Sequence, residues 1–242
     1  MTGLQTTAGW QPTLVTVGRL PMKPSYLAPA GVFDDDVDLP SNVLLLRGHG
    51  MTVLLDAGSG SFASGWPGGE DFLLPALAAA GCAPEDVDLV VLTHLDFDHC
   101  GGCIELPRAG VVAPDGAATS GEAGEEVLRR LSTESRLQWV PDGGSPADGL
   151  VLRAAPGHRL GHSIVEVGDA LVHLADVVHH AVQVEHPEWD REFDADPAMA
   201  LETRERVLAE MAARGLTVTA SHIDGPGRIV AGDGGALTWQ PA

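Results

Sequence analysis

Residues 93–102 read Thr-His-Leu-Asp-Phe-Asp-His-Cys-Gly-Gly and combine several side chains that can bind a metal. They follow the apolar run 87–92, and an apolar run that leads into a glycine pair is typical of a buried strand that ends in a loop. Side chains alternate along a strand, which predicts that His94, Asp96 and Asp98 point to one side, with His99 following as the loop turns. Two imidazoles and two carboxylates at one strand end suit one or two divalent metal ions.

This segment resembles the metal-binding loop of the metallo-β-lactamase superfamily, which reads His-x-His-x-Asp-His. The sequence departs from that pattern at the second ligand, where Asp96 stands in place of histidine. Three further segments resemble the family in order and type: Pro-Gly-His-x-x-Gly-His at residues 156–162, an apolar strand that ends at Asp176, and Ala-Ser-His at residues 220–222. Each motif alone is weak, but four in this order, between about residues 43 and 230, are a strong signal.

The resemblance implies a site for two divalent metal ions. The implied ligands are His94, Asp96 and His158 for the first ion, Asp98, His99 and His222 for the second, and Asp176 as a bridge between them. Two such ions share a water, lower its pKa toward about 7 and hold both the attacking and the leaving oxygen. A bridging carboxylate offsets the repulsion between the cations, whereas the same carboxylate buried without a partner would cost several kcal/mol. Zinc is the first expectation, and Asp96 would harden the site enough to admit iron or manganese.

Residues beside these ligands are expected to orient them or to act on the substrate. Asp56 matches a family position next to the metals, and His162 lies four residues after His158; for both we expect an orienting role. Lactonases of the superfamily carry a tyrosine three residues after the bridging aspartate, where this chain has His179. The resemblance implies that this role is either taken by His179, which would act in catalysis together with Asp98, or left vacant. A further alternative is that His179 is a surface residue.

Hydrophobic periodicity and turn residues predict the elements that position these side chains. The predicted strands cover residues 14–19, 42–48, 51–55, 87–92, 111–113, 136–140, 150–155, 163–167, 171–174, 216–220 and an edge strand at 228–230, and the predicted helices cover 71–80, 122–131 and 197–214. The order of several strands followed by a helix occurs twice along the chain. This order fits two mixed sheets packed face to face with helices outside. This is the four-layer αββα sandwich, of the α/β class, that the resemblance implies. We expect a single domain over residues 1–242 with an N-terminal arm over about residues 1–41.

Composition excludes several classes of function. The net charge is −20, from 34 acidic and 14 basic residues, so nucleic acid would be repelled and a nuclease is not expected. No apolar run approaches the roughly 18 residues of a membrane span. Three cysteines and an amino terminus without a signal-peptide pattern favour the cytoplasm. Cys100 and Cys103 form a Cys-x-x-Cys pair, which the glycine-containing metal loop explains without a redox role.

The segment 176–204 resembles the branch that contains lactonases and proteins like methyl parathion hydrolase. It implies a hydrolase that uses a metal-bridging hydroxide on a small-molecule ester or lactone. The alternatives are a thioesterase or phosphotriesterase on the same site, an iron-dependent oxidoreductase or dioxygenase, and a metal-binding accessory protein without turnover. A homodimer is compatible with the sequence. Two segments are candidates to close over an apolar substrate, the loop 60–67 and an arm with Met22, Tyr26, Leu27 and Phe33.

Overall fold

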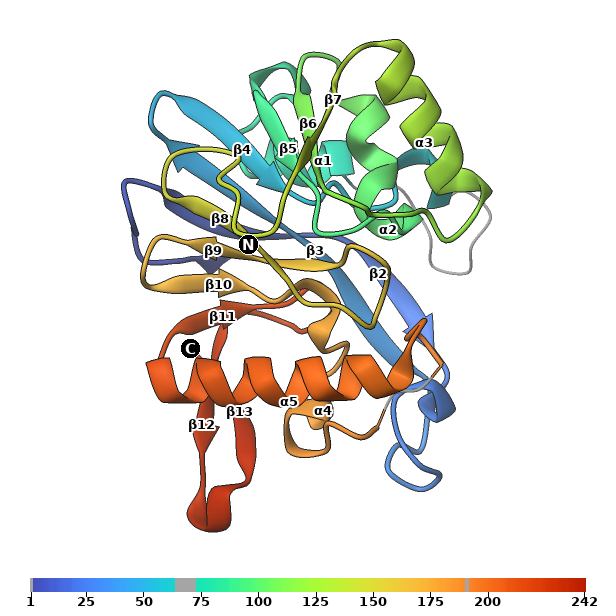
Figure 1. Ribbon diagram of the computed structural model, residues 1–242, viewed down its shortest axis with the longest axis vertical. Coiled ribbons are helices and arrows are strands. Elements are labelled where there is room, and N and C mark those ends of the chain that lie inside the picture. Colours follow the sequence, from blue (N-terminus) through green and yellow to red (C-terminus); the bar gives the residue numbers. More distant parts are fainter. Residues whose placement is uncertain (1, 64–72, 190–191) are drawn as a thin grey trace.

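The computed structural model describes residues 2–63, 73–189 and 192–242. Within these residues two mixed β-sheets lie face to face in the middle of the molecule, and helices cover the outer side of each sheet (Figure 1). The predicted four-layer αββα sandwich is therefore confirmed. No helix in the described part of the chain is long and apolar enough to cross a lipid bilayer.

The first sheet contains seven strands in chain order within the described residues: β1 (Thr2–Gly3), β2 (Gln11–Met22), β3 (Val37–Gly48), β4 (Met51–Leu55), β5 (Leu89–Val91), β6 (Gly110–Pro114) and β7 (Leu137–Val140). Strands β1 to β4 are antiparallel, and β4 to β7 are parallel. The predicted hairpin joins β3 to β4 through His49 and Gly50, whose φ angles of 50° and 74° suit a two-residue hairpin turn.

The second sheet contains six strands within the described residues, in the order β13 (Leu237–Pro241), β12 (Gly227–Ala231), β11 (Thr217–Thr219), β10 (Leu171–His173), β9 (Ser163–Val167) and β8 (Leu150–Ala154). Strands β8 and β10 are both antiparallel to β9, and β11 is parallel to β10. Strands β8, β10 and β11 therefore run in the same direction. Their C-terminal ends lie at one edge of the sheet, and so do the residues that follow them.

Side chains alternate between the two faces of each strand, and they fill the three apolar interfaces between the four layers. In β3, Leu44 and Leu46 pack between the two sheets, whereas Val43 and Leu45 pack on the outer side. That outer side is covered by α1 (Leu73–Ala79) and α3 (Glu122–Thr133). The outer side of the second sheet is covered by α5 (Pro197–Arg214), as Figure 1 shows. Both faces of each sheet are thus buried, and the sheets form a rigid base for the loops at their edge.

Helix α5 has the bounds that the sequence predicts. The carboxylate of Asp196 accepts a hydrogen bond from the Met199 backbone N–H (3.1 Å), and Pro197 occupies the first turn. The helix ends at Gly215, whose φ of 63° is the left-handed conformation that favours glycine at this position. These local signals explain why the prediction was accurate at both ends.

The metal loop differs from its prediction. Strand β5 ends at Val91, and α2 (Phe97–Cys100) is a single helical turn in which the backbone N–H groups of His99 and Cys100 donate to the Asp96 carbonyl (3.0 Å each). The expected strand-like alternation over this loop is therefore wrong. Asp98 and His99 are brought to the site by the helical turn instead.

Several boundaries also differ from prediction. The segment expected as an N-terminal arm contributes β1, β2 and the start of β3 to the first sheet. The predicted edge strand at 228–230 is β12, which lies inside the sheet because the unpredicted β13 pairs with its outer side. Residues 60–63 form a 3₁₀ turn, and the rest of the loop 60–67 and the start of the predicted helix 71–80 lie outside the described residues.

Candidate metal centre

The predicted site residues follow strand ends and meet at one edge of the two sheets. Asp56 follows β4, and residues 93–99 follow β5 in the first sheet. His158 follows β8, Asp176 follows β10 and His222 follows β11 in the second sheet. These strands end at the same edge of the two sheets, so segments that are far apart in the sequence meet there. The structure places all seven predicted ligands in this region.

The carboxylate of Asp176 lies at the centre of the cluster. Its Oδ2 atom is 3.3 Å from Nε2 of His99 and of His222, 3.5 Å from that of His158 and 3.9 Å from that of His94. The side chain is only 4% exposed, and its Oδ1 atom has no hydrogen-bond partner. Because a buried carboxylate needs a compensating partner, this position calls for positive charge.

The four histidines around Asp176 each donate their other ring nitrogen, Nδ1, to an oxygen. The acceptors are Thr93 Oγ1 for His94 (3.0 Å), Asp56 Oδ2 for His99 (2.8 Å), Asp194 Oδ1 for His158 (3.1 Å) and the Pro40 carbonyl for His222 (2.9 Å). A proton fixed on Nδ1 leaves the lone pair on Nε2, which is the arrangement typical of histidines that bind a metal. The Nε2 atoms of His94, His99 and His158 are buried without a hydrogen-bond partner.

The ligand atoms form two groups in the described part of the chain. One consists of His94, His158 and Asp176, and the other of Asp98, His99 and His222; within each group the atoms lie within 4.8 Å of one another. The Oδ2 atom of Asp176 is near the histidines of both groups. Unpartnered imidazole nitrogens that face a buried carboxylate fit two divalent ions.

Asp96 has a different environment from the other predicted ligands. Its Oδ1 accepts hydrogen bonds from Ser120 Oγ (2.6 Å) and Arg159 Nε (2.9 Å), and its Oδ2 is 2.8 Å from Arg159 Nη2. The same Oδ2 lies 3.8 Å from Nε2 of both His94 and His158. Asp96 belongs to neither of the two ligand groups among the described residues. Arg159 was not identified from the sequence, although it directly follows His158 and is one of few basic residues.

His162 and Asp56 have positions that suit an orienting role. His162 donates from Nδ1 to the Ala155 carbonyl (2.8 Å) and accepts the backbone N–H of Asp176 at Nε2 (3.2 Å), so both of its ring nitrogens are used. Asp56 has a φ of 57° and accepts hydrogen bonds from the backbone N–H and the hydroxyl of Thr93 (2.8 Å each). Asp56 thus links the strand end to the ring of His99.

Two further residues that orient a ligand were missed by the sequence analysis. Asp194 accepts the His158 Nδ1–H and pairs through Oδ2 with Arg204 Nη2 (3.0 Å). The Arg204 side chain is 2% exposed and also donates from Nε to the Val177 carbonyl (2.6 Å). This buried ion pair ties His158 to helix α5. No sequence signal connects residues 36 positions apart, although both lie in the segment that resembles the lactonase branch.

His179 lies inside the site, so the alternative of a surface residue is wrong. It is 4% exposed, and its Nε2 is 3.4 Å from Asp176 Oδ2. Its ring is stacked on that of His222, with centroids 5.6 Å apart and planes at 13°, and it also contacts Phe193 at 4.9 Å. This position, beside the ligands and facing the cavity, is compatible with a role toward substrate.

Burial and neighbouring charges perturb the titration of the cluster. Burial holds the pKa of His94 and of His158 well below the usual value. Burial opposes protonation of His99 as well, but the carboxylates of Asp176 and Asp98 raise the pKa of that histidine well above its usual value. Burial raises the pKa of Asp98, partly offset by His99 and His222. The rings of His94 and His158 therefore stay neutral and keep the lone pairs that a metal ion binds.

A cavity of about 330 Å³ opens onto this cluster. Its apolar wall consists of Leu20, Met22, Leu39, Phe97 and Phe193. The first three come from the extended ends of β2 and β3, which project past the rest of the sheet. Met22, one of the four arm residues that were candidates to close over the substrate, therefore lines the cavity.

The rest of that arm lies behind or beside the cavity wall. Leu27 and Phe33 pack in the apolar cluster of Leu20 and Leu39. Tyr26 is more exposed and contacts Phe193, with ring centroids 5.7 Å apart. The arm therefore supports the wall from outside rather than lying across the ligands.

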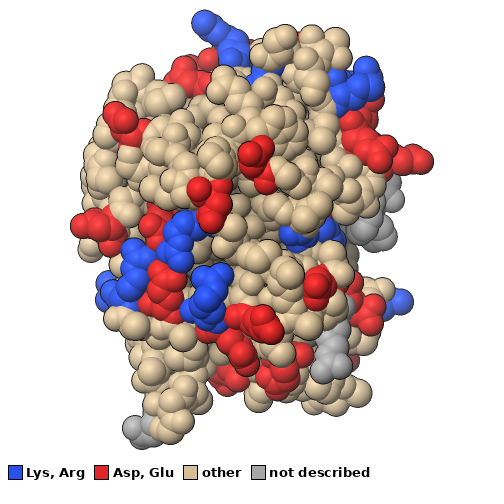
Figure 2. All heavy atoms as spheres, in the orientation of Figure 1, with Lys and Arg blue, Asp and Glu red and all other residues tan. Residues whose placement is uncertain are grey.

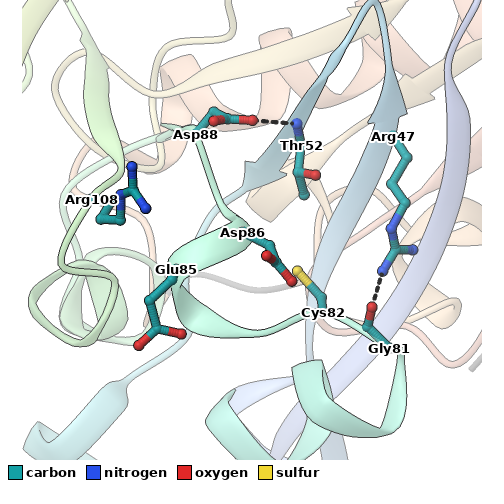
Figure 3. A pocket seen from close by; sticks show the side chains of 8 residues that line it. All are labelled: Arg47, Thr52, Gly81, Cys82, Glu85, Asp86, Asp88 and Arg108. Carbon is teal, nitrogen blue, oxygen red and sulfur yellow. Dashed lines mark hydrogen bonds between the residues drawn. The ribbon is translucent and has the colours of Figure 1, made fainter.

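A second hollow of about 470 Å³ lies at the opposite ends of the parallel strands (Figure 3). It mixes Arg47 and Arg108 with acidic side chains, and the backbone N–H of Thr52 donates to Asp88 Oδ2 (2.8 Å). Burial raises the pKa of the Cys82 thiol at its edge. Neither of the two ligand groups found among the described residues lies here, so this hollow is not the metal site.

Cys100 and Cys103 are buried and form no disulfide among the described residues. Burial raises the pKa of both thiols, to about 12 for Cys103. Such thiols are poor nucleophiles.

Comparison with known proteins identifies the family. The family model described as "Metallo-beta-lactamase superfamily" matches residues 36–237. The "Probable metallo-hydrolase Rv2300c" of Mycobacterium tuberculosis is 32% identical over 124 residues, which is 41% of this chain and 40% of that protein. The human "Metallo-beta-lactamase domain-containing protein 1" is 33% identical over 150 residues, which is 60% of this chain and 52% of that protein. The matched regions thus cover about half or less of these relatives.

Solved structures resemble the chain over nearly its whole length. The "hydrolase AbOPH in beta lactamase superfamily" has a TM-score of 0.87 and 25% identity, with 99% of this chain and 96% of that chain covered. AidC, described as a dizinc quorum-quenching lactonase in complex with a product, has a TM-score of 0.84 and 21% identity, with 100% and 97% covered. At that identity the second likeness is one of fold.

Proposed function

The chain belongs to the metallo-beta-lactamase superfamily, and from that premise we propose that it is a dinuclear metal-dependent hydrolase of uncharged small-molecule esters or lactones. The observation that carries the proposal is the position of Asp176 Oδ2, within 3.3–3.9 Å of four histidine Nε2 atoms at the end of a partly apolar cavity. The names of the relatives as metallo-hydrolases support hydrolysis.

The proposed ligands divide between two positions. The first position would use His94, His158 and Asp176, and the second would use Asp98, His99, His222 and the same Asp176. Bound there, two divalent ions would lower the pKa of a water between them and polarise the scissile carbonyl. We propose zinc, because imidazoles dominate the set. A free carboxylate at Asp96 would favour a harder ion such as iron, but its ion pair with Arg159 neutralises the charge of that carboxylate.

Two residues are proposed to handle protons. Asp98 lines the cavity with a side chain that is 15% exposed, and it would accept a proton from the attacking water and return it to the leaving alkoxide when the C–O bond breaks. His179 also lines the cavity, and its Nε2 would donate a hydrogen bond to the carbonyl oxygen as negative charge develops there. His179 would thus take the place of the tyrosine that lactonases of the superfamily carry.

The charge of the cavity favours an uncharged substrate. Among the described residues that line it, Arg159 is the one lysine or arginine, and its guanidinium is already paired with Asp96. An anionic substrate would find no free basic group there and would approach a protein of net charge −20. Basic side chains on the face in Figure 2 lie beside acidic ones. Arg153, for example, forms an ion pair with Glu210 (2.7 Å). An uncharged phosphotriester meets the same conditions and is the second candidate substrate class.

A substrate panel tests the proposal. Zinc-loaded protein is assayed with lactones, carboxylic esters, uncharged phosphotriesters and anionic thioesters by product release. We expect turnover of an uncharged ester or lactone, and a fall in kcat of about 100-fold or more in Asp98→Asn and His179→Gln.

His186→Gln is the matched control, because His186 is 43% exposed and stacked on Trp189 away from the cluster. It should leave kcat unchanged. Absence of turnover on every uncharged ester and lactone would contradict the proposed substrate class. Unchanged kcat in His179→Gln would remove His179 from the mechanism.

A further inference from the structure

The carboxylate of Asp96 is held by two residues that are not proposed metal ligands, Arg159 and Ser120. Arg159 contacts both of its oxygens, through Nε to Oδ1 (2.9 Å) and Nη2 to Oδ2 (2.8 Å), and Ser120 Oγ donates to Oδ1 (2.6 Å). This is the two-pronged geometry in which arginine binds a carboxylate most strongly. The pair is shielded as well, with side-chain exposures of 10% for Asp96 and 22% for Arg159.

The formal charges of the pair cancel. Asp96 adds −1 where the family loop has a neutral imidazole, and Arg159 adds +1 at hydrogen-bonding distance. The unit is neutral as a whole, like the ring it replaces. Two donated hydrogen bonds and the ion-pair contact at Oδ2 also draw electron density from the carboxylate, so less remains for a cation. Only Oδ2 faces the histidines, at 3.8 Å from Nε2 of His94 and of His158.

We propose that Arg159 and Ser120 hold Asp96 as a neutralised carboxylate beside the first metal position, so that this position binds its ion more weakly than the second. The inference rests on the proposed dinuclear function. The first position is left with His94, His158 and the shared Asp176 as full ligands. The second keeps Asp98, whose Oδ2 is 3.7 Å from Nε2 of both His99 and His222 and has no arginine among the ion partners found in the described residues. The ions therefore load in order, the second position first.

Metal titration measures this directly. Metal-free protein is titrated with Co²⁺, followed by calorimetry and by the visible absorption of the bound ion. We expect two steps, with affinities about tenfold or more apart, and loss of only the weaker step in His94→Gln. In Arg159→Met the freed carboxylate should tighten the weaker step by about tenfold or more. An arginine that merely supports a ligand would do the opposite, because losing such support weakens metal binding by about 10–100-fold.

A second variant guards against damage to the loop, since Arg159 Nη1 also donates to the carbonyls of His158 and Phe193. Ser120→Ala removes one hydrogen bond from Asp96 and leaves those contacts in place. It should tighten the weaker step by about twofold to tenfold. Arg19→Met is the matched control: Arg19 is 45% exposed and pairs with Asp38 and Asp224, not with a proposed ligand. It should leave the weaker step within about twofold.

The outcomes separate the two proposals. If neither variant tightens the weaker step, or if Arg19→Met tightens it as much as Arg159→Met, the role of Arg159 is refuted. Equal affinities at both positions in the unchanged protein refute it too. If no Co²⁺ binds at all, the proposed dinuclear function fails.

Discussion

Replacing Asp194 with asparagine perturbs the buried ion pair that holds His158. The change keeps the shape of the side chain and removes its charge. The partner, Arg204, is 2% exposed and Asp194 is fully buried in the pair, so no water can take over the lost charge. Removing one member of a buried ion pair costs about 3–5 kcal/mol. The guanidinium keeps its hydrogen bonds to the carbonyls of Val177 and Pro187. We therefore expect the free energy of unfolding to fall by about 3 kcal/mol, the low end of that range.

That loss is large against the roughly 5–15 kcal/mol by which domains are stable. Urea unfolding of the metal-free protein measures this loss. Metal titration should show the affinity of the first position falling by about 10–100-fold, because the one amide oxygen of asparagine cannot accept from both His158 and Arg204. Glu126→Gln is the matched control, since Glu126 pairs with the exposed Arg129 and Arg130 on α3 and its loss should barely move the unfolding midpoint. If the free energy of unfolding of Asp194→Asn lies within about 0.5 kcal/mol of that of the unchanged protein, the buried ion pair does not stabilise the fold as proposed.

Three further predictions concern the ligand centre, a backbone contact and pH. Asp176→Asn should lose both metal ions and the rise in unfolding temperature that they cause, and metal retention at two ions per chain would show that Asp176 is not the shared ligand. Gly157→Ala should destabilise the fold in urea, because at a φ of 124° its Cβ would lie 2.2 Å from the Ala200 backbone nitrogen; unchanged stability would mean that the loop and α5 can separate at no cost. A hydrogen bond from Arg153 lowers the pKa of Glu210 to about 2, from its ordinary 4.5. Burial acts in the opposite direction, and a hydrogen bond from Arg214 lowers the pKa further. A lowered carboxyl pKa stabilises the fold above pH 4.5, and that contribution is lost as the pH falls toward 2. Glu210→Gln should therefore cost about 1 kcal/mol at pH 7, and the gap to the unchanged protein should close below pH 4.5; a gap that is constant with pH would refute the ion-pair account.

Local signals made much of the fold predictable. Helix α5 carries a capping aspartate, a proline in its first turn and a glycine just past its end, and its bounds were predicted correctly. Strand β9 was also predicted at its observed bounds, because alternation and flanking turn residues define it. The candidate ligands could be named because each follows a short apolar strand within a recognisable motif.

Interactions between distant residues could not be predicted in this way. Arg159 reaches Asp96 across 63 positions, and Asp194 reaches His158 across 36, so only the folded chain reveals either pair. The helical turn after Asp96 was missed because two apolar residues among polar ones look like a strand end. Strand β13 was missed because its pairing with β12, not its own pattern, makes it a strand.

Anomalous diffraction from crystals grown with zinc tests whether two ions share Asp176. Data collected on both sides of the zinc absorption edge locate each ion and the side chains around it. We expect two zinc peaks per chain, one among His94, His158 and Asp176 and the other among Asp98, His99, His222 and the same Asp176. A single peak, or two peaks of which neither contacts Asp176, would contradict that expectation.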